Sequence, residues 1–584
     1  MALRPLDQPP KIGLPGGWEL VASEAGRSNQ GLKTTVTLFN GTAQGCHTFP
    51  VGDVAAQQTL AEAFATLTGL APEDIAKALI ALAAAVEGAL RQQGEAKDGQ
   101  ASQATQLVTL ALDAGAALFH TPDSEAYATI EVDGHKETWP LKVKGFRRWL
   151  ARLFYQAADK SPGAQAVQDA LGVLEGKALF DGPELPVYTR LAEHNGAIYL
   201  DLADGQWQAI EVTANGWRVV AEPPVKFRRA KGMLPLPVPV KGGSLSALRG
   251  LVNVATDADW RLLVSWLIAA LRPTGPYPVL VVYGEQGSAK STLVRVLRAL
   301  LDPNMAALRT TPRDERDLVI AATNGWCIAL DNLSHLSDWL SDALCRLATG
   351  SGFATRELYS DAEEAIFVAQ RPVVLNGIEE LATRGDLLDR AIVLYLPTIS
   401  EHTRQHEQHF WQAFQRVRPQ LLGALLDVVT QALQILPGIQ VERLPRMADF
   451  ALWACAAAPA CGWTVEDFLT AYAGVRASSH DLVLEASPVG QAVRELVTTQ
   501  GHWEGTASLL LGVLGDLVGE KITKQQTWPK NGRSFSNALR RVAPTLRAVG
   551  IACTFAGNTG KSRARMISLQ ECSTPSRERE QGAL

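Results

Sequence analysis

The chain has 584 residues, of which 47% are hydrophobic and 20% charged, and its formal net charge is −5. The composition is that of an ordinary globular protein able to bury several cores, and the length alone predicts about four domains. The acidic balance excludes a chain that is basic throughout, so any nucleic-acid site must be a local concentration of Lys and Arg.

The first two regions of the chain differ in their patterns. Residues 1–92 predict a mostly helical region, with one short strand at 34–39 followed by alanine- and leucine-rich helices. A polar stretch rich in Gly, Gln and Ala then predicts a linker. Residues 106–232 give a mixed signal and predict an α+β accessory domain. Its expected elements are a helix at 106–119, a hairpin at 127–139, a helix from 144, and strands at 197–202 and 207–212.

The second half of the chain follows a stiff connector. Alternating prolines before residue 241 favour an extended conformation. The regions expected after the connector are an ATPase core at 244–400, a helical extension at 401–485, a small basic domain at 486–570 and a polar tail at 571–584.

Residues 284–292 are the most informative stretch, because they lie between a buried strand at 279–283 and an amphipathic helix. A glycine-rich loop that leads into a helix beginning with Lys-Ser is the pattern of a phosphate-binding loop. A glycine-rich turn without a ligand is the alternative. The residues predicted to bind ATP are Gly284, Glu285, Gln286, Gly287, Ser288, Ala289, Lys290, Ser291 and Thr292.

Each residue type in this loop has a chemical role. The N–H groups and dipole at the helix start favour phosphate oxygens, Lys290 can neutralise the β and γ phosphates, and Ser291 can complete a magnesium shell. ATP and Mg²⁺ are therefore the predicted cofactors. The loop departs from G-x-x-x-x-G-K-[ST] at Ala289, where we expect backbone dihedrals that a Cβ permits.

Two apolar strands downstream end in polar residues. One ends in Asp331, which can hold the magnesium shell, and another ends in Asn376, which can position a water or sense the γ-phosphate. In a parallel sheet both ends lie beside the phosphate loop. Arg384 and Arg390 precede a further strand, and an arginine supplied in trans contributes on the order of 10³ to 10⁵ in rate. Each motif alone is common in proteins, but their order indicates a ring-forming ATPase.

These motifs resemble the superfamily 3 helicases, in particular the helicase parts of phage and plasmid primase-helicases. The resemblance covers about 244–400 and implies an α/β, AAA+-like P-loop core that forms a ring, expected to be a hexamer. It also implies a hairpin, between the strands that end in Asp331 and Asn376, that grips single-stranded DNA. Arg356 and Tyr359 resemble the residues of that hairpin that line the channel, and a cation beside an aromatic ring suits a single strand. A surface hairpin with solvated charges is the alternative, favoured by nearby acids.

One further departure concerns hydrolysis. Asn332 stands where many relatives have a second acid, and an amide cannot accept a proton from water. Either Asp331 serves both roles, or Glu285 assists, or hydrolysis is slow and the ATP site acts more as a switch.

Residues 521–570 contain no Asp or Glu and are rich in Lys and Arg, which predicts a local electropositive face. Helical signals followed by a hairpin resemble a winged-helix domain, and Pro544 predicts a kink or break in the last helix. A basic face that packs on the ring is the alternative. The candidate DNA-binding residues here are Arg533, Asn537, Arg540 and Arg541 on the helix, and Lys561, Arg563 and Arg565 on the wing.

The cysteines and the apolar runs bear on location. The seven cysteines are scattered without metal-ligand spacing, which indicates reduced thiols in a cytosol. The longest apolar runs fall short of the roughly 20 residues that span a bilayer, and residues 1–5 have no apolar signal region. We therefore expect a cytoplasmic protein without a membrane partner.

The leading hypothesis is an ATP-dependent DNA helicase that acts in replication of a phage, plasmid or integrated element. Its expected partners are single-stranded or forked DNA and further copies of itself, and a primase or polymerase is a candidate. The competing hypothesis is an ATP-gated initiator or loader that assembles on DNA without unwinding it. A small-molecule kinase is disfavoured by the basic terminal domain.

Overall fold

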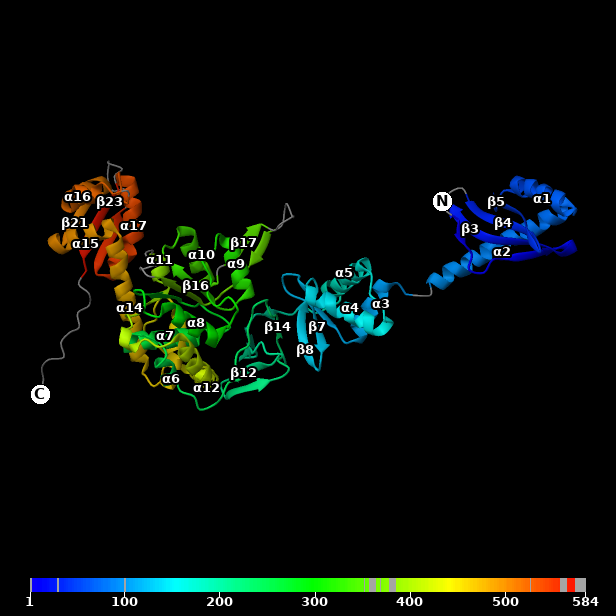
Figure 1. The fold of residues 1–584 in the computed structure, drawn as a ribbon. Helices are drawn as coiled ribbons and strands as arrows, with labels where there is room; N and C mark the ends of the chain where they lie inside the picture. Colours follow the sequence, from blue (N-terminus) through cyan, green and yellow to red (C-terminus); the bar gives the residue numbers. More distant parts are fainter. Residues whose placement is uncertain are drawn as a thin grey trace. The chain divides into compact units, whose positions relative to one another are not determined.

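The computed structural model describes residues 3–28, 31–98, 101–350, 352–356, 364–367, 369–377, 385–525, 527–556 and 565–572 (Figure 1). The chain forms two compact units. The first comprises Met1–Ala114 and Lys142–Gly176, and the second comprises Gly115–Leu141 and Lys177–Leu584. Both contain helices and strands, so the protein is of mixed α/β class.

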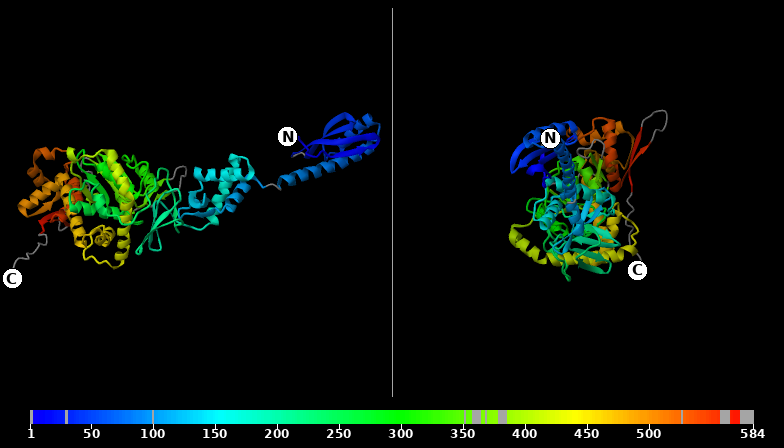
Figure 2. Two further views of the ribbon diagram at one scale, coloured as in Figure 1. Left: turned by 60° about the horizontal axis from the view of Figure 1, so that its bottom comes forward. Right: turned by 90° about the vertical axis from the view of Figure 1, so that its right-hand side faces the viewer.

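The first unit begins with an antiparallel five-stranded sheet of order β1-β3-β4-β5, with β2 paired to β3. Helix α2 lies along this sheet and packs against β2 and β3 (Figure 2). Its elements are β1 (Arg4–Pro5), β2 (Lys11–Leu14), β3 (Trp18–Ser28), β4 (Gly31–Asn40), β5 (Thr42–Pro50), α1 (Val54–Thr68) and α2 (Pro72–Asp98).

This region holds more strand than the sequence predicted. We expected one strand at 34–39, which falls within β4, and otherwise mostly helix. Strand β5 was missed because its residues lack apolar alternation: it is exposed or half-exposed along most of its length. Strand β3 was also missed, although its Leu20 and Ala22 are buried at alternating positions. Strand β5 has no buried face of its own and forms through backbone pairing with β4. Helix α2 also continues into the stretch expected to be a linker.

The rest of the first unit is helical. Helix α4 (Lys144–Ala158) buries Phe146, Leu150 and Phe154 along one side, as expected of apolar residues at helical spacing. The other helices are α3 (Gln103–Asp113) and α5 (Ala164–Phe180), whose last turn belongs to the second unit.

The second unit starts with small sheets that form the accessory region. The predicted hairpin corresponds to β7 and β8, which join β6 in an antiparallel sheet, and β10-β11-β12-β13 form another. The strands are β6 (Ala117–His120), β7 (Ala126–Val132), β8 (His135–Pro140), β9 (Val187–Tyr188), β10 (Leu191–His194), β11 (Ala197–Asp201), β12 (Ala209–Thr213), β13 (Gly216–Val220) and β14 (Lys226–Phe227).

The core of the second unit is a parallel sheet of order β16-β19-β15-β20. At its edge, Arg309 forms a single parallel bridge to Leu330. The strands are β15 (Val279–Tyr283), β16 (Ile328–Leu333), β19 (Val373–Gly377) and β20 (Ala391–Tyr395), and β19 is preceded by the antiparallel pair β17 (Phe353–Arg356) and β18 (Glu364–Phe367).

Helices cover both faces of this sheet, because its strands are apolar on both sides. Leu280 and Val282 face one hydrophobic cluster, and Val279 and Val281 face another. In Figure 1, α7 and α8 lie on one side of β16, and α9 and α10 lie on the other. The helices are α6 (Leu245–Arg249), α7 (Asp257–Ala269), α8 (Lys290–Leu301), α9 (Glu315–Asn324), α10 (Asp338–Thr349) and α11 (Gly385–Leu388).

A helical extension follows the sheet. It consists of α12 (Glu407–Ile435), α13 (Ala448–Ala457) and α14 (Val465–Ala486). Among the described residues, Glu407–Gly438 is the one helical stretch long and apolar enough to cross a membrane, and half of its most apolar window is buried inside the protein. Because α12 packs against α6, α7, α8 and α13, we interpret it as a core helix.

The C-terminal part has its own hydrophobic core and an antiparallel sheet of order β21-β23-β22. Sequence analysis missed β21, which is short and polar. Pro544 does not end α17, which continues to Ala548 because Val542, Thr545 and Leu546 on both sides of the proline are buried. The elements are α15 (Pro488–Gln500), β21 (His502–Thr506), α16 (Ala507–Thr523), α17 (Gly532–Ala548), β22 (Ile551–Ala556) and β23 (Met566–Glu571).

Candidate functional site

The loop between β15 and α8 lies at the carboxyl edge of the parallel sheet. Strand β15 is flanked by β19 and β20, so the loop occupies the crevice where ligands bind in open α/β sheets. Gly284 has a φ of +152°, and a Cβ at this position would collide with the carbonyl oxygen of Leu396. Glycine is therefore required for the loop to lie this close to the chain that follows β20.

Ala289 adopts a left-handed backbone conformation, with φ 64° and ψ 28°, directly before α8 begins. This differs from our expectation that the residue would keep dihedrals favourable for a Cβ, and such a conformation costs a non-glycine residue about 1–2 kcal/mol. Asn332, after the predicted magnesium ligand, is also left-handed at φ 55°. Strained residues of this kind cluster at functional sites.

The Lys290 side chain folds back over the loop. Its Nζ donates to the carbonyl oxygens of Gly284 and Glu285, each at 2.7 Å, and to Ser288 Oγ at 3.3 Å. Partial burial lowers the pKa of Lys290, and the charge of Asp331 opposes that shift. The ammonium group is therefore held at the loop by neutral acceptors, which phosphate oxygens can replace.

Ser291, Asp331 and Asn376 meet at the same edge. Ser291 Oγ donates to Asp331 Oδ1 at 2.9 Å, and the backbone N–H of Asn332 donates to Asn376 Oδ1 at 2.8 Å. Asn376 is 1% exposed, and within the described part of the chain its Nδ2 is buried without a hydrogen-bond partner. An unpaired buried donor costs about 1–3 kcal/mol, which a ligand accepting that hydrogen bond would recover.

The segment after β20 runs beside the loop, and sequence reasoning did not find it. Ile399 N–H donates to the carbonyl of Gly287 at 3.2 Å, and Thr398 Oγ1 donates to Glu285 Oε2 at 3.2 Å. Asn253 Nδ2 donates to the carbonyls of Ser288, at 3.1 Å, and Pro397, at 2.5 Å. No local motif marks these residues, since each contact joins distant parts of the sequence.

Arg390 lies at the amino ends of the parallel strands, whereas the phosphate loop lies at their carboxyl ends. Its carbonyl accepts from the N–H of Val279, the first residue of β15, and its Nη1 donates to the carbonyl of Asp386 at 2.7 Å. Because parallel strands all run in the same direction, the full length of β15 separates Arg390 from Lys290 of the same chain. Arg384 lies outside the described residues.

The predicted DNA-binding residues fall on two elements. Arg356 belongs to the backbone of β17, where it pairs with Glu364; its side chain is outside the described part, as is Tyr359. On α17 the predicted positions are all exposed, opposite the buried face of that helix. These are Arg533, Asn537, Arg540 and Arg541. The guanidinium of Arg540 lies 4.2 Å from the ring centroid of Phe555.

Of the predicted wing residues, Arg565 is exposed just before β23, and the other two lie outside the described residues. Those two are Lys561 and Arg563. The structure thus brings Lys290, Ser291, Asp331 and Asn376 together. The described basic residues of the terminal domain belong to a part of the chain with a different hydrophobic core.

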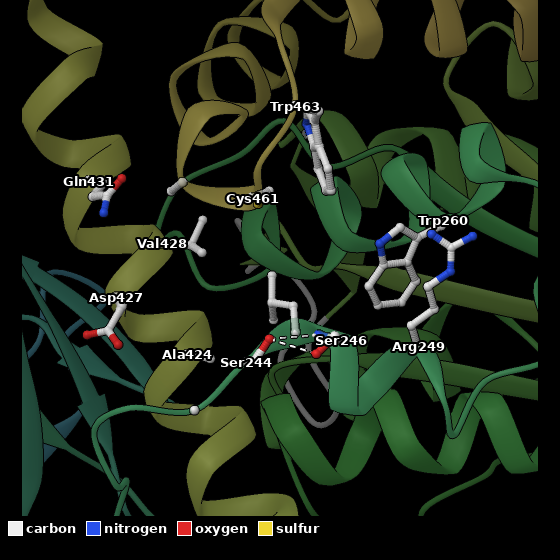
Figure 3. Close-up of a pocket in the computed structure, with 13 residues that line it drawn as sticks. Ser244, Ser246, Arg249, Trp260, Ala424, Asp427, Val428, Gln431, Cys461 and Trp463 are labelled. Atoms are coloured by element: carbon white, nitrogen blue, oxygen red, sulfur yellow. Dashed lines mark hydrogen bonds between the residues drawn. The ribbon is translucent and has the colours of Figure 1, made fainter.

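A separate cavity of about 370 Å³ lies between α6, α12 and the residues that follow α13 (Figure 3). Its charged groups are engaged, because Arg249 pairs with Asp257 and Asp427 accepts from Trp217 Nε1 at 2.7 Å. Burial raises the pKa of Cys461 to about 12, so this thiol is protonated at neutral pH. None of the predicted site residues lines the cavity, and we assign it no catalytic role.

Comparison with known families gives the class of the protein. Residues 245–484 match the model of the actinomycete integrative conjugative element replication protein, and residues 489–580 match the AICE RepA C-terminal domain. Together the matched regions make up more than half of the chain. The chain is therefore a replication protein of integrative conjugative elements. Within that class, it carries both domains of the AICE RepA family.

Other comparisons add little. No curated protein matches the sequence. The solved C-terminal region of NrS-1 is similar, at 12% identity and a TM-score of 0.37, over 81% of this chain and 100% of that one. A JCV helicase structure has 10% identity and a TM-score of 0.20 over 34% of this chain and 60% of that one. Both TM-scores are below 0.5, so neither similarity carries an argument about function.

Proposed function

We propose that this replication protein is an ATP-dependent DNA helicase of the superfamily 3 type that acts in replication of its element. The observation that carries the proposal is the 2.9 Å hydrogen bond from Ser291 Oγ to Asp331 Oδ1, next to Lys290 at the start of α8. A hydroxyl and a carboxylate in this arrangement are the groups that hold magnesium against nucleotide phosphates, and the lysine carries the charge that the β and γ phosphates require.

The residues fit a magnesium ion. Magnesium prefers oxygen ligands and keeps several waters, so Ser291 and Asp331 suffice when substrate phosphates supply further oxygens. When bound, the ion neutralises charge that develops on the transferring phosphate. Asn376 would donate its unpaired Nδ2 hydrogen to a phosphate oxygen or to the attacking water, because Asn332 N–H already occupies its Oδ1.

The position of Arg390 supports a site shared between subunits. Arg390 cannot serve the loop of its own chain from the opposite edge of the sheet, whereas a neighbouring copy in a ring can present it there. We therefore propose a homohexameric ring in the cytoplasm, with Arg390 or Arg384 acting in trans. The hairpin that contains Arg356 and Tyr359 would contact the single-stranded or forked DNA.

The terminal domain supports a second DNA contact. Its order α15-β21-α16-α17-β22-β23 is the order of a winged-helix domain, and α17 would be the helix that faces a groove. Arg533, Asn537 and Arg541 are exposed on α17, and each phosphate contact of this kind makes affinity depend on salt. Arg540 packs on Phe555, so it also holds α17 against the sheet.

Turnover and unwinding test the proposal. Wild-type protein should hydrolyse ATP faster with single-stranded DNA and should separate a forked duplex, and Lys290→Ala should abolish both activities. Turnover that persists in Lys290→Ala would remove the site assignment, because Lys290 is the one cation among residues 284–292.

One observation favours the alternative, an ATP-gated initiator or loader. Asn332 occupies the position of a second acid and cannot act as a base, and Glu285 is hydrogen-bonded by Thr398. If Asp331 alone cannot activate water, hydrolysis would be slow and the nucleotide would control assembly on DNA. Turnover stimulated by single strands without any fork unwinding would support this alternative and reject the motor.

A further inference from the structure

The first residues of the segment 396–404, up to Ile399, are hydrogen-bonded to the phosphate loop and to the strand before it. Leu396 N–H donates to the carbonyl of Tyr283 at 2.9 Å, and Ile399 N–H donates to the carbonyl of Gly287 at 3.2 Å. The Asn253 side chain bonds to carbonyls of both the loop and the segment. These contacts hold residues 396–399 beside the loop, and a 3-10 turn at Glu401–Thr403 leads from them to one further residue.

That residue is Arg404. A Cβ built on Gly287 would lie 3.3 Å from Arg404 Nη2, so the guanidinium stands directly over this glycine of the loop. The side chain is 54% exposed, and its Nη1 lies 4.0 Å from Glu401 Oε1, itself 86% exposed. An exposed ion pair at that distance is worth less than about 1 kcal/mol, so it does not prevent the guanidinium from turning to a stronger anion.

The chemistry of the group suits phosphate. A guanidinium is always charged, and its planar fork donates two parallel hydrogen bonds to a phosphate. Lys290 lies over the beginning of the loop, through Gly284 and Glu285, and Arg404 lies over Gly287. The loop therefore carries two cations from the same chain, one from α8 and one from the segment after β20.

We infer that Arg404 binds the phosphates of the nucleotide held by the loop of its own chain. This inference rests on the proposed function, because it requires a nucleotide at residues 284–292. Arg404 would act on the nucleotide of its own subunit, whereas Arg390 is proposed to act on the nucleotide of a neighbouring subunit.

Nucleotide affinity tests the contact. Titration of the full-length protein with ATP and Mg²⁺ should show about tenfold weaker binding for Arg404→Ala, the loss expected for one charge-assisted hydrogen bond. Arg404→Lys should recover part of the affinity. Arg416→Ala, an exposed arginine on α12, is the matched control and should bind ATP like wild type. Unchanged affinity in Arg404→Ala would overturn the inference, while loss of binding in Lys290→Ala would leave the proposed function intact.

Mixing variants tests the assignment to the same chain. A mixture of Lys290→Ala and Arg404→Ala protein contains no site with both cations if Arg404 acts in its own chain, so turnover should not exceed the mean of the two separate variants. If the mixture regains turnover, Arg404 serves the neighbouring site and the inference is wrong. A mixture of Lys290→Ala and Arg390→Ala, for which recovery is expected in a ring, shows that subunits exchange.

Discussion

Replacing Ala289 with glycine should stabilise the core, although the same change destabilises most helices. Ala289 has φ 64°, and relief of that left-handed conformation is worth about 1–2 kcal/mol. The greater conformational freedom of glycine in the unfolded chain lowers the free energy of unfolding by about 0.5–1 kcal/mol. The expected net effect is a stabilisation of about 0.5 kcal/mol.

Ala299→Gly is the matched control, because Ala299 lies inside α8, the helix that Ala289 precedes. There the substitution relieves no strain and should cost about 1 kcal/mol. The two variants should therefore differ by about 1.5 kcal/mol, which corresponds to roughly 3–6 °C in the midpoint of a domain of 150–250 residues.

Scanning calorimetry measures this difference. The chain has several cores, so its unfolding need not be two-state, and the relevant transition is the one that ATP and Mg²⁺ shift upwards. If Ala289→Gly lowers that midpoint as much as Ala299→Gly does, then Ala289 is not strained, and the account of the loop backbone is wrong.

Three further predictions concern other parts of the second unit. Asp302→Asn should destabilise the core by about 3 kcal/mol, because it leaves the fully buried Arg190 without its carboxylate. Burial alone would raise the pKa of Asp302, but the charges of Arg190 and Arg298 outweigh burial and lower the pKa. The stability that the ionised Asp302 contributes is therefore present above pH of about 4 and lost in acid. Acid unfolding followed by circular dichroism should show that the stability difference between wild type and Asp302→Asn disappears at low pH. Asn376→Ala should reduce ATP turnover at least about tenfold, and equal turnover would contradict its role. Arg541→Ala should lower the salt dependence of DNA binding by about one unit in log–log slope, and an unchanged slope would remove this residue from the DNA surface.

The core strands were predictable because they are continuous apolar runs buried on both faces. The sequence therefore located β15, β16, β19 and β20, and the polar residues that end β16 and β19 lie where parallel pairing requires. The contacts of Asn253, Thr398 and Arg404 with the loop were not predictable, since they join residues 35 or more positions apart, which no local pattern links.

The weaker predictions failed for physical reasons that differ. Strand β5 and strand β21 are short of apolar residues and form by pairing with neighbours, so no periodicity marks them. Pro544 was expected to kink or break α17, and the helix is not broken there, because buried residues lie on both sides of the proline. The left-handed Ala289 could not be read from composition, because the sequence shows only that glycine is absent.

Direct titration of ATP and Mg²⁺ into wild-type and Lys290→Ala protein tests the central claim most directly. If triphosphate binds at residues 284–292, wild type should bind with measurable affinity and Lys290→Ala should bind at least about tenfold more weakly, since a charged hydrogen bond of about 1.5–3 kcal/mol is lost. Equal affinity in the two proteins would contradict the claim, because the nucleotide would then lie elsewhere.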